Sequence, residues 1–341
     1  MGSTIRDVAL KAQVSPATVS RVLNGNSYVK EETRKKVQEV MQELQYIPSI
    51  AGRKTAGGGS RKLGMIVPDI CNPFFSEVFY ASSLAAEEHG YQLLLYHSNE
   101  SITSESLAIQ NLLSDQVEGL LITPVADDNE VNVPLLHLVQ EKGIPIVFID
   151  REMKTITCDG IFIDNVRGSY EATALLLNQG HRRIATIAGP VNTIPGRERL
   201  EGFTKAMTDY GCEIPEGYIQ YGDFKSKSSY QSTNHLLDLP VPPTAIFTCN
   251  NLATVGCLKA LLSRSKEIPK DISVVGFDEV DLLDTLGFHI TVVARATSEM
   301  GRVAIQQVVS RIANPAESVI HQRIVLQPHL KCCGSERFGV K

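Results

Sequence analysis

Apolar positions in the first 47 residues recur at helical spacing in three short stretches. In the first stretch they fall at i, i+3, i+4 and i+7, which places them along one face of a helix, and the next two also follow helical periodicity. The stripes are Ile5, Val8, Ala9 and Ala12, then Val19, Val22 and Leu23, then Val37, Val40, Met41 and Leu44. Three short helices that bury such stripes in one corner are typical of a helix-turn-helix module.

Local signals mark the ends of these helices. Thr4 precedes the first stripe and Asp7 follows three residues later, which favours a capping box. Ser15 is a suitable N-cap for the second helix, and Pro16 suits its first position. The run Asn-Gly-Asn at 24–26 ends that helix.

The outward face of the second helix carries side chains suited to the major groove of DNA. Arg21 is the candidate for a bidentate contact to guanine, whereas Pro16 and Ala17 offer only apolar contact, for example to a thymine methyl group. Hydroxyl and basic side chains nearby could position phosphates. The predicted DNA-contacting residues of the head are Thr4, Ser15, Pro16, Ala17, Thr18, Ser20, Arg21, Asn24 and Tyr28. A three-helix packing domain that binds no nucleic acid is the alternative.

From residue 63 onward, short apolar runs alternate with helical patterns, for example over 75–89, 166–179, 199–210 and 252–263. This alternation predicts an α/β body of parallel sheets with helices on both faces. Ten strand candidates exceed one comfortable open sheet, so we expect two lobes with a ligand cleft at the carboxyl ends of the strands. The candidates are LGMIVP, YQLLLYH, GLLITP, IPIVFID, GIFID, RIATIAG, YIQYGD, TAIFTC, SVVGF and ITVVA.

Polar and aromatic residues follow these strands at the end where a ligand would bind. They are Asn72, Phe74, Phe75, Asp150, Arg151, Arg199, Phe224, Asn250 and Asp278. Carboxylates and guanidinium groups can saturate sugar hydroxyls while rings stack on sugar C–H faces, so a gap of saccharide size is expected there. Turn, cap and core roles for the same residues are the alternative.

Charge is distributed unevenly along the chain. Residues 1–62 hold 11 Lys/Arg against 5 Asp/Glu, a net charge of +6, and the remaining residues carry -11. A basic head on an acidic body suggests that only the head meets a polyanion, although a solvated basic face would look the same.

The composition indicates in which compartment the protein is expected. No apolar run reaches the roughly 20 residues of a transmembrane helix, and the start lacks an apolar signal core, so a cytoplasmic protein without a membrane partner is expected. Seven cysteines without a C-x-x-C spacing are expected to be free thiols, with neither a disulfide frame nor a metal site, and no cofactor is expected.

The sequence gives little support for an enzymatic function. Nucleophile-elbow, zinc-protease, dinucleotide-binding and P-loop motifs are all missing from the sequence. Asp150 and Asp278 could form an acid/base pair in a sugar enzyme. Arg151 and Arg199 are expected to flank them and to favour the ionised carboxylates, which suits binding better than proton transfer. We therefore predict that the chain is not an enzyme.

The stretch TIRDVALKAQVSPATVSRVLNGNSYVKEETRKKVQEVMQELQYIPS resembles the DNA-binding head of the LacI/GalR family of bacterial transcription regulators. The resemblance continues through the chain and is most specific in VSPATVSRVLNG, GHRRIATIAGP and DISVVGFDEV. Gln13 departs from the Gly or Asn usual in the turn, and a left-handed backbone there costs it about 1 kcal/mol. His181 of GHRRI is expected to order a turn.

The cleft residues also resemble the ribose-repressor subgroup, through NPFF, IDRE, GRERLEGF, FTCN and GFDE. Carried over position by position, the resemblance implies an effector site made of the nine residues that follow the strands. Relatives have a glutamine near the end of an LTTVxQP segment, where this chain has ITVVARA and therefore Arg295. A third guanidinium would favour a phosphorylated or otherwise acidic sugar over free ribose.

The linker departs from the family pattern. Relatives form a hinge helix there, whose leucine wedges into the minor groove. The aligned residue is Thr55, and three glycines follow at 57–59, each of which costs a helix about 1 kcal/mol relative to alanine. We expect a weaker hinge helix and reduced DNA bending, with Arg53 and Lys54 still available to phosphates.

These features predict a helix-turn-helix domain over 1–47, a hinge over 48–62 and an effector-binding and dimerisation domain over 63–341. The N-lobe is expected at 63–163 plus 294–322, and the C-lobe at 164–293 plus 323–341. The resemblance implies a homodimer, joined through the helix around 76–88. The tail lacks a leucine heptad, so no tetramer is expected.

The implied function is repression of sugar-catabolism genes from a palindromic operator, relieved by ribose, a related pentose or its phosphate. Control by a corepressor or by a protein co-effector is the alternative. A cytosolic sugar-binding protein or a sugar enzyme is a remote one.

Overall fold

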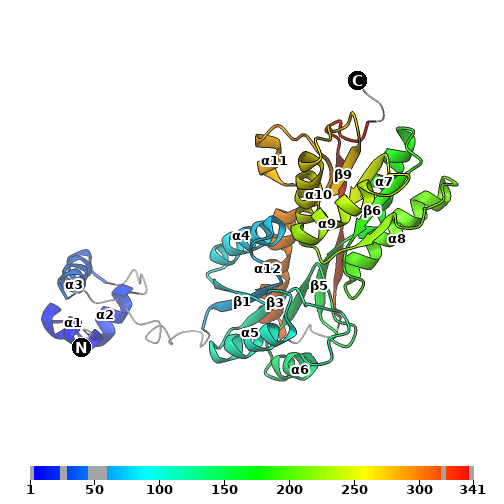
Figure 1. Ribbon diagram of the computed structural model, residues 1–341. Helices are drawn as coiled ribbons and strands as arrows, with labels where there is room; N and C mark the ends of the chain where they lie inside the picture. The colour runs from blue at the N-terminus through cyan, green and yellow to red at the C-terminus, as the bar shows by residue number, and fades with distance from the viewer. Residues whose placement is uncertain (1–3, 24–28, 45–59, 316–319, 338–341) are drawn as a thin grey trace. The chain divides into compact units, whose positions relative to one another are not determined.

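The computed structural model describes residues 4–23, 29–44, 60–315 and 320–337, in two compact units that divide after Ser60. The first unit is a helical head and the second a larger α/β body (Figure 1). No described helix has the length and apolar composition that crossing a bilayer demands.

The head contains the three expected helices. They are α1 (Ile5–Ala12), α2 (Pro16–Leu23) and α3 (Glu31–Glu43). Val8, Ala12, Val19 and Val37 are fully buried in one cluster, because each stripe faces the other two helices. The predicted helix-turn-helix arrangement of apolar faces is confirmed.

Capping sets the start of each of the first two helices. Thr4 and Asp7 form the expected capping box, with the Thr4 N–H donating to the Asp7 carboxylate at 2.7 Å. Ser15 Oγ accepts from the Thr18 N–H at 3.1 Å and so caps α2. Gln13 ends α1 in the left-handed region, with φ of 57°, so the departure at this position is accommodated without a glycine.

The body consists of two lobes, each built on a six-stranded sheet. The N-lobe sheet has the order β11-β5-β4-β3-β1-β2 and the C-lobe sheet the order β12-β10-β9-β8-β6-β7. All pairings are parallel except that of β12 with β10. The N-lobe strands are β1 (Lys62–Val67), β2 (Gln92–His97), β3 (Gly119–Ile122), β4 (Ile146–Ile149), β5 (Asp159–Ile163) and β11 (Arg323–Leu326). The C-lobe strands are β6 (Ile184–Ala188), β7 (Ile219–Tyr221), β8 (Ala245–Thr248), β9 (Ser273–Phe277), β10 (Thr291–Ala294) and β12 (His329–Lys331).

Helices cover both faces of each sheet (Figure 1). Neighbouring residues of β1 show why, since Met65 belongs to one apolar cluster and Ile66 to another on the opposite face. The helices of the N-lobe are α4 (Pro73–Glu88), α5 (Ile102–Ser114), α6 (Val133–Glu141) and α12 (Thr297–Ala313). Those of the C-lobe are α7 (Asn165–Asn178), α8 (Ile194–Asp209), α9 (Ser226–Leu237), α10 (Asn251–Ser263) and the short α11 (Asp281–Thr285).

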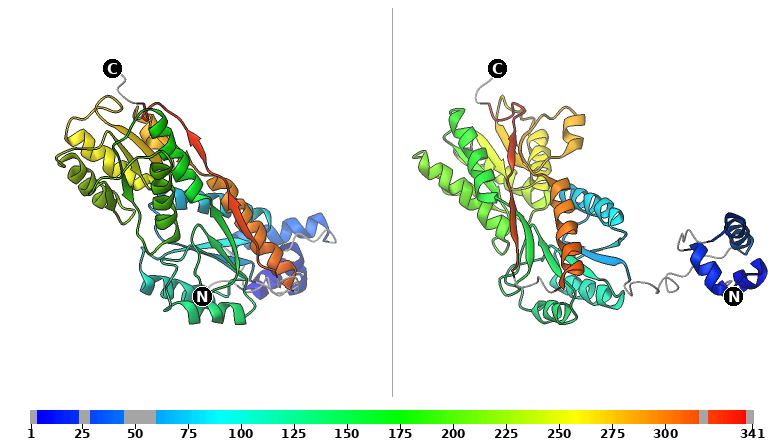
Figure 2. Two further views of the ribbon diagram at one scale, coloured as in Figure 1. Left: turned by 90° about the vertical axis from the view of Figure 1, so that its right-hand side faces the viewer. Right: turned by 180° about the vertical axis from the view of Figure 1, so that it is seen from behind.

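The chain passes between the lobes three times, after β5, after β10 and after β11, and Figure 2 shows the last of these passages in red. All ten predicted strands are present, but β11 and β12 were not predicted. Residues 323–326 were expected in the C-lobe, and this is wrong, because β11 pairs with β5 in the N-lobe sheet. Both strands lie at sheet edges, where exposed and partly buried residues alternate, so neither shows the continuous apolar run of a central strand.

His181, which was expected to order a turn, instead uses its side chain to connect neighbouring strands. It is buried just before β6, with Nδ1 2.9 Å from Thr244 Oγ1 and Nε2 3.0 Å from Ser273 Oγ. These contacts tie together the starts of three neighbouring strands. Burial lowers the pKa of His181 from its ordinary value of 6.5 to about 4.

This pKa predicts a loss of stability in acid. Between about pH 6.5 and 4 the unfolded chain binds a proton at His181 that the folded chain does not, so the free energy of unfolding falls as pH falls, by at most about 3 kcal/mol. In urea unfolding followed by circular dichroism, His181→Gln should show a shallower pH dependence over this range than the wild type. His137→Gln, at an exposed histidine, should behave as the wild type. Equal slopes for all three chains would contradict the assignment.

Candidate functional site

A cavity between the two lobes collects the side chains expected to bind the effector. All ten of them line it, and they come from both lobes. Six further lining residues were not predicted, namely Asp69, Glu100, Pro195, Asp223, Lys225 and Leu252. Glu100 lies shortly after β2. Its position after a strand is the same sequence signal that predicted the other lining residues.

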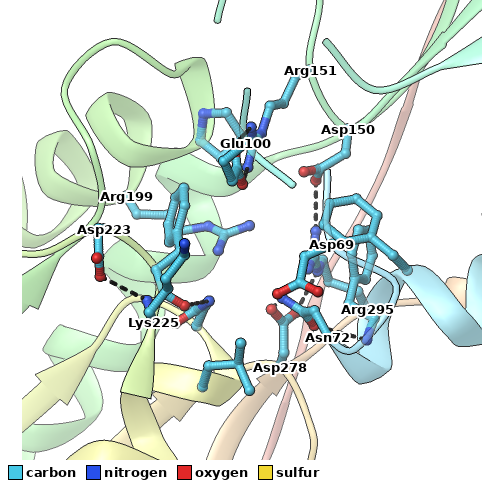
Figure 3. A pocket seen from close by; sticks show the side chains of 16 residues that line it. Asp69, Asn72, Glu100, Asp150, Arg151, Arg199, Asp223, Lys225, Asp278 and Arg295 are labelled. Carbon is cyan, nitrogen blue, oxygen red and sulfur yellow. Dashed lines mark hydrogen bonds and ion pairs between the residues drawn. The ribbon is translucent and has the colours of Figure 1, made fainter. Parts of the chain in front are cut away.

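The cavity is small in this conformation. It measures about 30 Å³, whereas sites that enclose a small ligand measure roughly 300–1,000 Å³. The expectation of a saccharide-sized gap is therefore wrong for this state of the molecule. The side chain of Arg295 is one of those that line this space, where it lies beside Asp150 and Asp278 (Figure 3).

The carboxylates of Asp150 and Asp278 lie at the ends of strands. Asp150 directly follows β4 in the N-lobe, and Asp278 directly follows β9 in the C-lobe. Both have left-handed backbones, with φ of 63° and 72°, and Phe224 shares this feature with φ of 63°. The left-handed region is unfavourable for residues other than glycine. Residues held in it often lie at functional sites.

Two asparagines serve both the fold and the cavity. Asn72 caps α4 by accepting from the Phe74 N–H at 3.0 Å, and its Oδ1 also accepts from Asn251 of the opposite lobe at 2.8 Å. Asn250 caps α10 by accepting from the Ala253 N–H at 2.8 Å. The cap role and the cavity position therefore coexist in the same side chains.

Arg295 pairs with both carboxylates. Its Nη1 donates to Asp150 at 2.6 Å, its Nη2 donates to the second oxygen of Asp278 at 2.7 Å, and its Nε donates to the first (Figure 3). The guanidinium carbon also lies 3.3 Å from the centroid of the Phe74 ring. Every nitrogen of this guanidinium is therefore engaged, and the pairs join residues of both lobes.

Arg151 pairs with a different carboxylate. Two parallel hydrogen bonds of 2.9 Å each connect it to Glu100. Burial alone would lower the pKa of Arg151, but the ion pair with Glu100 outweighs burial and raises it. Among the described side chains, Arg151 Nε is a buried donor without a hydrogen-bond partner.

Arg199 differs from both. Its Nε donates to Asn165 at 2.9 Å and its Nη1 to the Cys249 carbonyl at 2.6 Å, and only 3% of the residue is exposed. Within the described ranges no carboxylate lies within 4 Å of it. Burial lowers the pKa of Arg199, and the positive charge of Arg295 lowers it further. Arg151 and Arg199 line the same cavity as the two aspartates, as expected, but the ion pairs of these aspartates are made with Arg295.

The described residues were also compared with the needs of a metal site. In the part of the chain that the structure describes, no three His, Cys, Asp or Glu side chains are arranged to hold an ion.

The head presents the expected face of α2. Ser15, Pro16, Ala17 and Arg21 are exposed there, while Thr18 and Ser20 are half-exposed. The Thr4 hydroxyl donates to Asp7 at 2.7 Å within the capping box. Five predicted DNA contacts, Asn24, Tyr28, Arg53, Lys54 and Thr55, lie outside the described residues, as does the expected hinge helix.

Family models match both units. Residues 4–49 match the model for bacterial regulatory proteins of the lacI family. Residues 60–330, most of the chain, match the model for periplasmic binding proteins and the sugar-binding domain of the LacI family. The chain belongs to the LacI family.

Individual LacI-family proteins are similar over nearly the whole chain. The ribose operon repressor of Escherichia coli K12 is 33% identical over 334 residues, covering 98% of this chain and 99% of the relative. The HTH-type transcriptional repressor CytR of the same strain is 33% identical over 309 residues, covering 89% and 88%. The crystal structure of the lac repressor dimer bound to operator and the anti-inducer ONPF matches with a TM-score of 0.84 at 25% identity, covering 99% of this chain and 100% of that one. This LacI-family chain is accordingly a DNA-binding transcriptional repressor.

The Arg151–Glu100 pair predicts a measurable contribution to stability. Glu100→Ala leaves a buried guanidinium without its counter-charge, which should lower the free energy of unfolding by about 2 kcal/mol, less than for a fully buried pair because 26% of the Glu100 side chain is exposed. Urea unfolding of the full chain measures this loss. Glu213→Ala, at an exposed glutamate, is the control and should change stability by less than about 0.5 kcal/mol. An equally small change for Glu100→Ala would show that the pair is dispensable.

Proposed function

We propose that this LacI-family repressor binds a palindromic operator as a homodimer and is released when a sugar or sugar phosphate occupies the cleft between its lobes. The observation that carries the proposal is the convergence of ten predicted polar and aromatic side chains, from both lobes, on one cavity. Since a ligand there contacts both lobes at once, its binding energy depends on their relative position.

The chemistry of the cavity favours a polyol. The carboxylates of Asp150 and Asp278 accept from hydroxyl groups, the guanidinium of Arg199 donates to them, and the rings of Phe74 and Phe224 offer faces for sugar C–H groups. The name of the ribose operon repressor, similar over almost the full chain, supports a ribose-like effector. Genes of sugar catabolism are the corresponding targets, and no catalysis is expected.

Repression from a palindrome needs two heads. We expect the dimer to form through α4, where Tyr80 and Leu84 are 67% and 47% exposed although both are large and apolar. A two-fold dimer would read two half-sites about one helical turn apart, with one α2 in each major groove. Effector binding would then shift the lobes and weaken operator binding by about 1–3 kcal/mol of coupling.

Arg21 provides the test of sequence reading by the head. Arg21→Ala removes the proposed bidentate contact to guanine. The preference of the variant protein for an operator over a scrambled duplex should therefore be about 5- to 150-fold lower than that of the wild type. Fluorescence anisotropy with an operator selected from random duplexes measures both affinities. Lys35→Ala is the control, because it removes the same charge from an exposed position on α3 and should leave the preference intact. A preference equally reduced by both variants would refute base reading by Arg21.

A further inference from the structure

Arg295 occupies the part of the cleft where a ligand would meet both carboxylates. Its guanidinium lies between Asp150 and Asp278 and over the ring of Phe74 (Figure 3). Only 3% of its side chain is exposed, and 6% of either aspartate side chain. A sugar whose hydroxyl groups take over the carboxylate oxygens that Arg295 now holds must therefore displace Arg295.

A neutral sugar cannot replace what this displacement removes. Hydroxyl groups would satisfy the aspartates, but Arg295 would be left as a buried cation without a counter-charge, which is strongly unfavourable. A second buried cation without an ion pair lies nearby, because Arg199 has no carboxylate within 4 Å in the described part of the chain. The guanidinium carbons of Arg295 and Arg199 lie 5.7 Å and 3.8 Å, respectively, from the centroid of the Phe277 ring.

An anionic sugar resolves both problems at once. Its phosphate or carboxylate would supply a counter-charge to Arg199 and to the displaced Arg295, while its hydroxyls take over Asp150 and Asp278. Burial and then the positive charge of Arg295 lower the pKa of Arg199, and the negative charges of Asp278 and Asp150 do not offset them.

We propose that Arg295 determines the charge class of the effector, so that the cleft accepts a sugar carrying an anionic group and rejects its neutral counterpart. This inference rests on the proposed effector site and goes further by naming the class of ligand and the residue that selects it. Arg295 acts through exchange of ion-pair partners, since only a ligand that brings its own anion leaves no buried charge alone.

Matched probes test the selection directly. Isothermal titration calorimetry with D-ribose, D-ribose 5-phosphate, D-glucose, D-glucose 6-phosphate and inorganic phosphate gives the affinity ratio of each sugar phosphate to its parent sugar. We expect a ratio of at least ten for one pair in the wild type, with inorganic phosphate weaker than that sugar phosphate. Arg295→Gln, which keeps a polar side chain but removes the charge, should lower this ratio at least tenfold.

Two further variants control the reading. Arg264→Gln breaks an exposed pair with Asp238 on the C-lobe surface and should keep the wild-type ratio. Arg295→Lys keeps the charge and should stay closer to the wild type than to Arg295→Gln, with circular dichroism confirming that each variant is folded. Because the wild-type ratio is itself decisive, the test survives a variant that fails to fold.

Several results would overturn the inference. They are a wild type that binds the parent sugar as tightly as the phosphate, a ratio unchanged in Arg295→Gln, binding of inorganic phosphate as tight as that of the sugar phosphates, and no binding of any probe. Operator release in the anisotropy assay reports separately on the proposed function. Release by a neutral sugar would thus refute selection by Arg295 while the effector-controlled repressor stands.

Discussion

Two aspartates from different lobes meet across the cleft, and one arginine pairs with both. This three-residue arrangement connects the parts of the body, because Asp150 ends a strand of the N-lobe, Asp278 ends a strand of the C-lobe and Arg295 follows β10 at a passage between them. Without the guanidinium, two buried carboxylates would face each other at close range. The ion pairs at this point therefore hold the two lobes together, and in the inference drawn above they also select what can enter between the lobes.

The rest of the body places these groups. Parallel strands end at the same edge of each sheet, so residues far apart in sequence arrive at one cleft. Left-handed turns after β4 and β9 hold the carboxylates, and asparagine caps fix the first turns of α4 and α10 beside them. In the proposed function, coupling to DNA uses the same geometry, since a ligand that changes the separation of the lobes would change the body to which the basic head is joined.

Much of this organisation could be predicted from the sequence. The apolar stripes around Val8 and Val19 predicted the helices of the head, and the apolar runs predicted ten strands, because helical and strand periodicities are local properties. Cavity residues such as Asn250 and Asp278 could be predicted because they follow buried strands, where the topology of parallel sheets dictates their destination.

What could not be predicted depends on distant partners. The strand β11 carries alternating half-exposed residues, and only its pairing with β5 places it in the N-lobe. Arg295 was expected to be a third cation free to bind ligand, but its position against two carboxylates satisfies every nitrogen. Side-chain identity showed that charges would gather in the cleft, whereas which charge neutralises which depends on distances that the sequence does not encode locally.

Reciprocal titration tests whether the cleft and the head are thermodynamically linked. The affinity of the full chain for the tightest-binding sugar or sugar phosphate is measured with and without saturating operator duplex, and operator affinity with and without saturating ligand. If they are linked, the effector and the operator each weaken the binding of the other by the same factor, between about 5- and 150-fold. Ligand affinity that does not change when operator is bound would contradict this linkage.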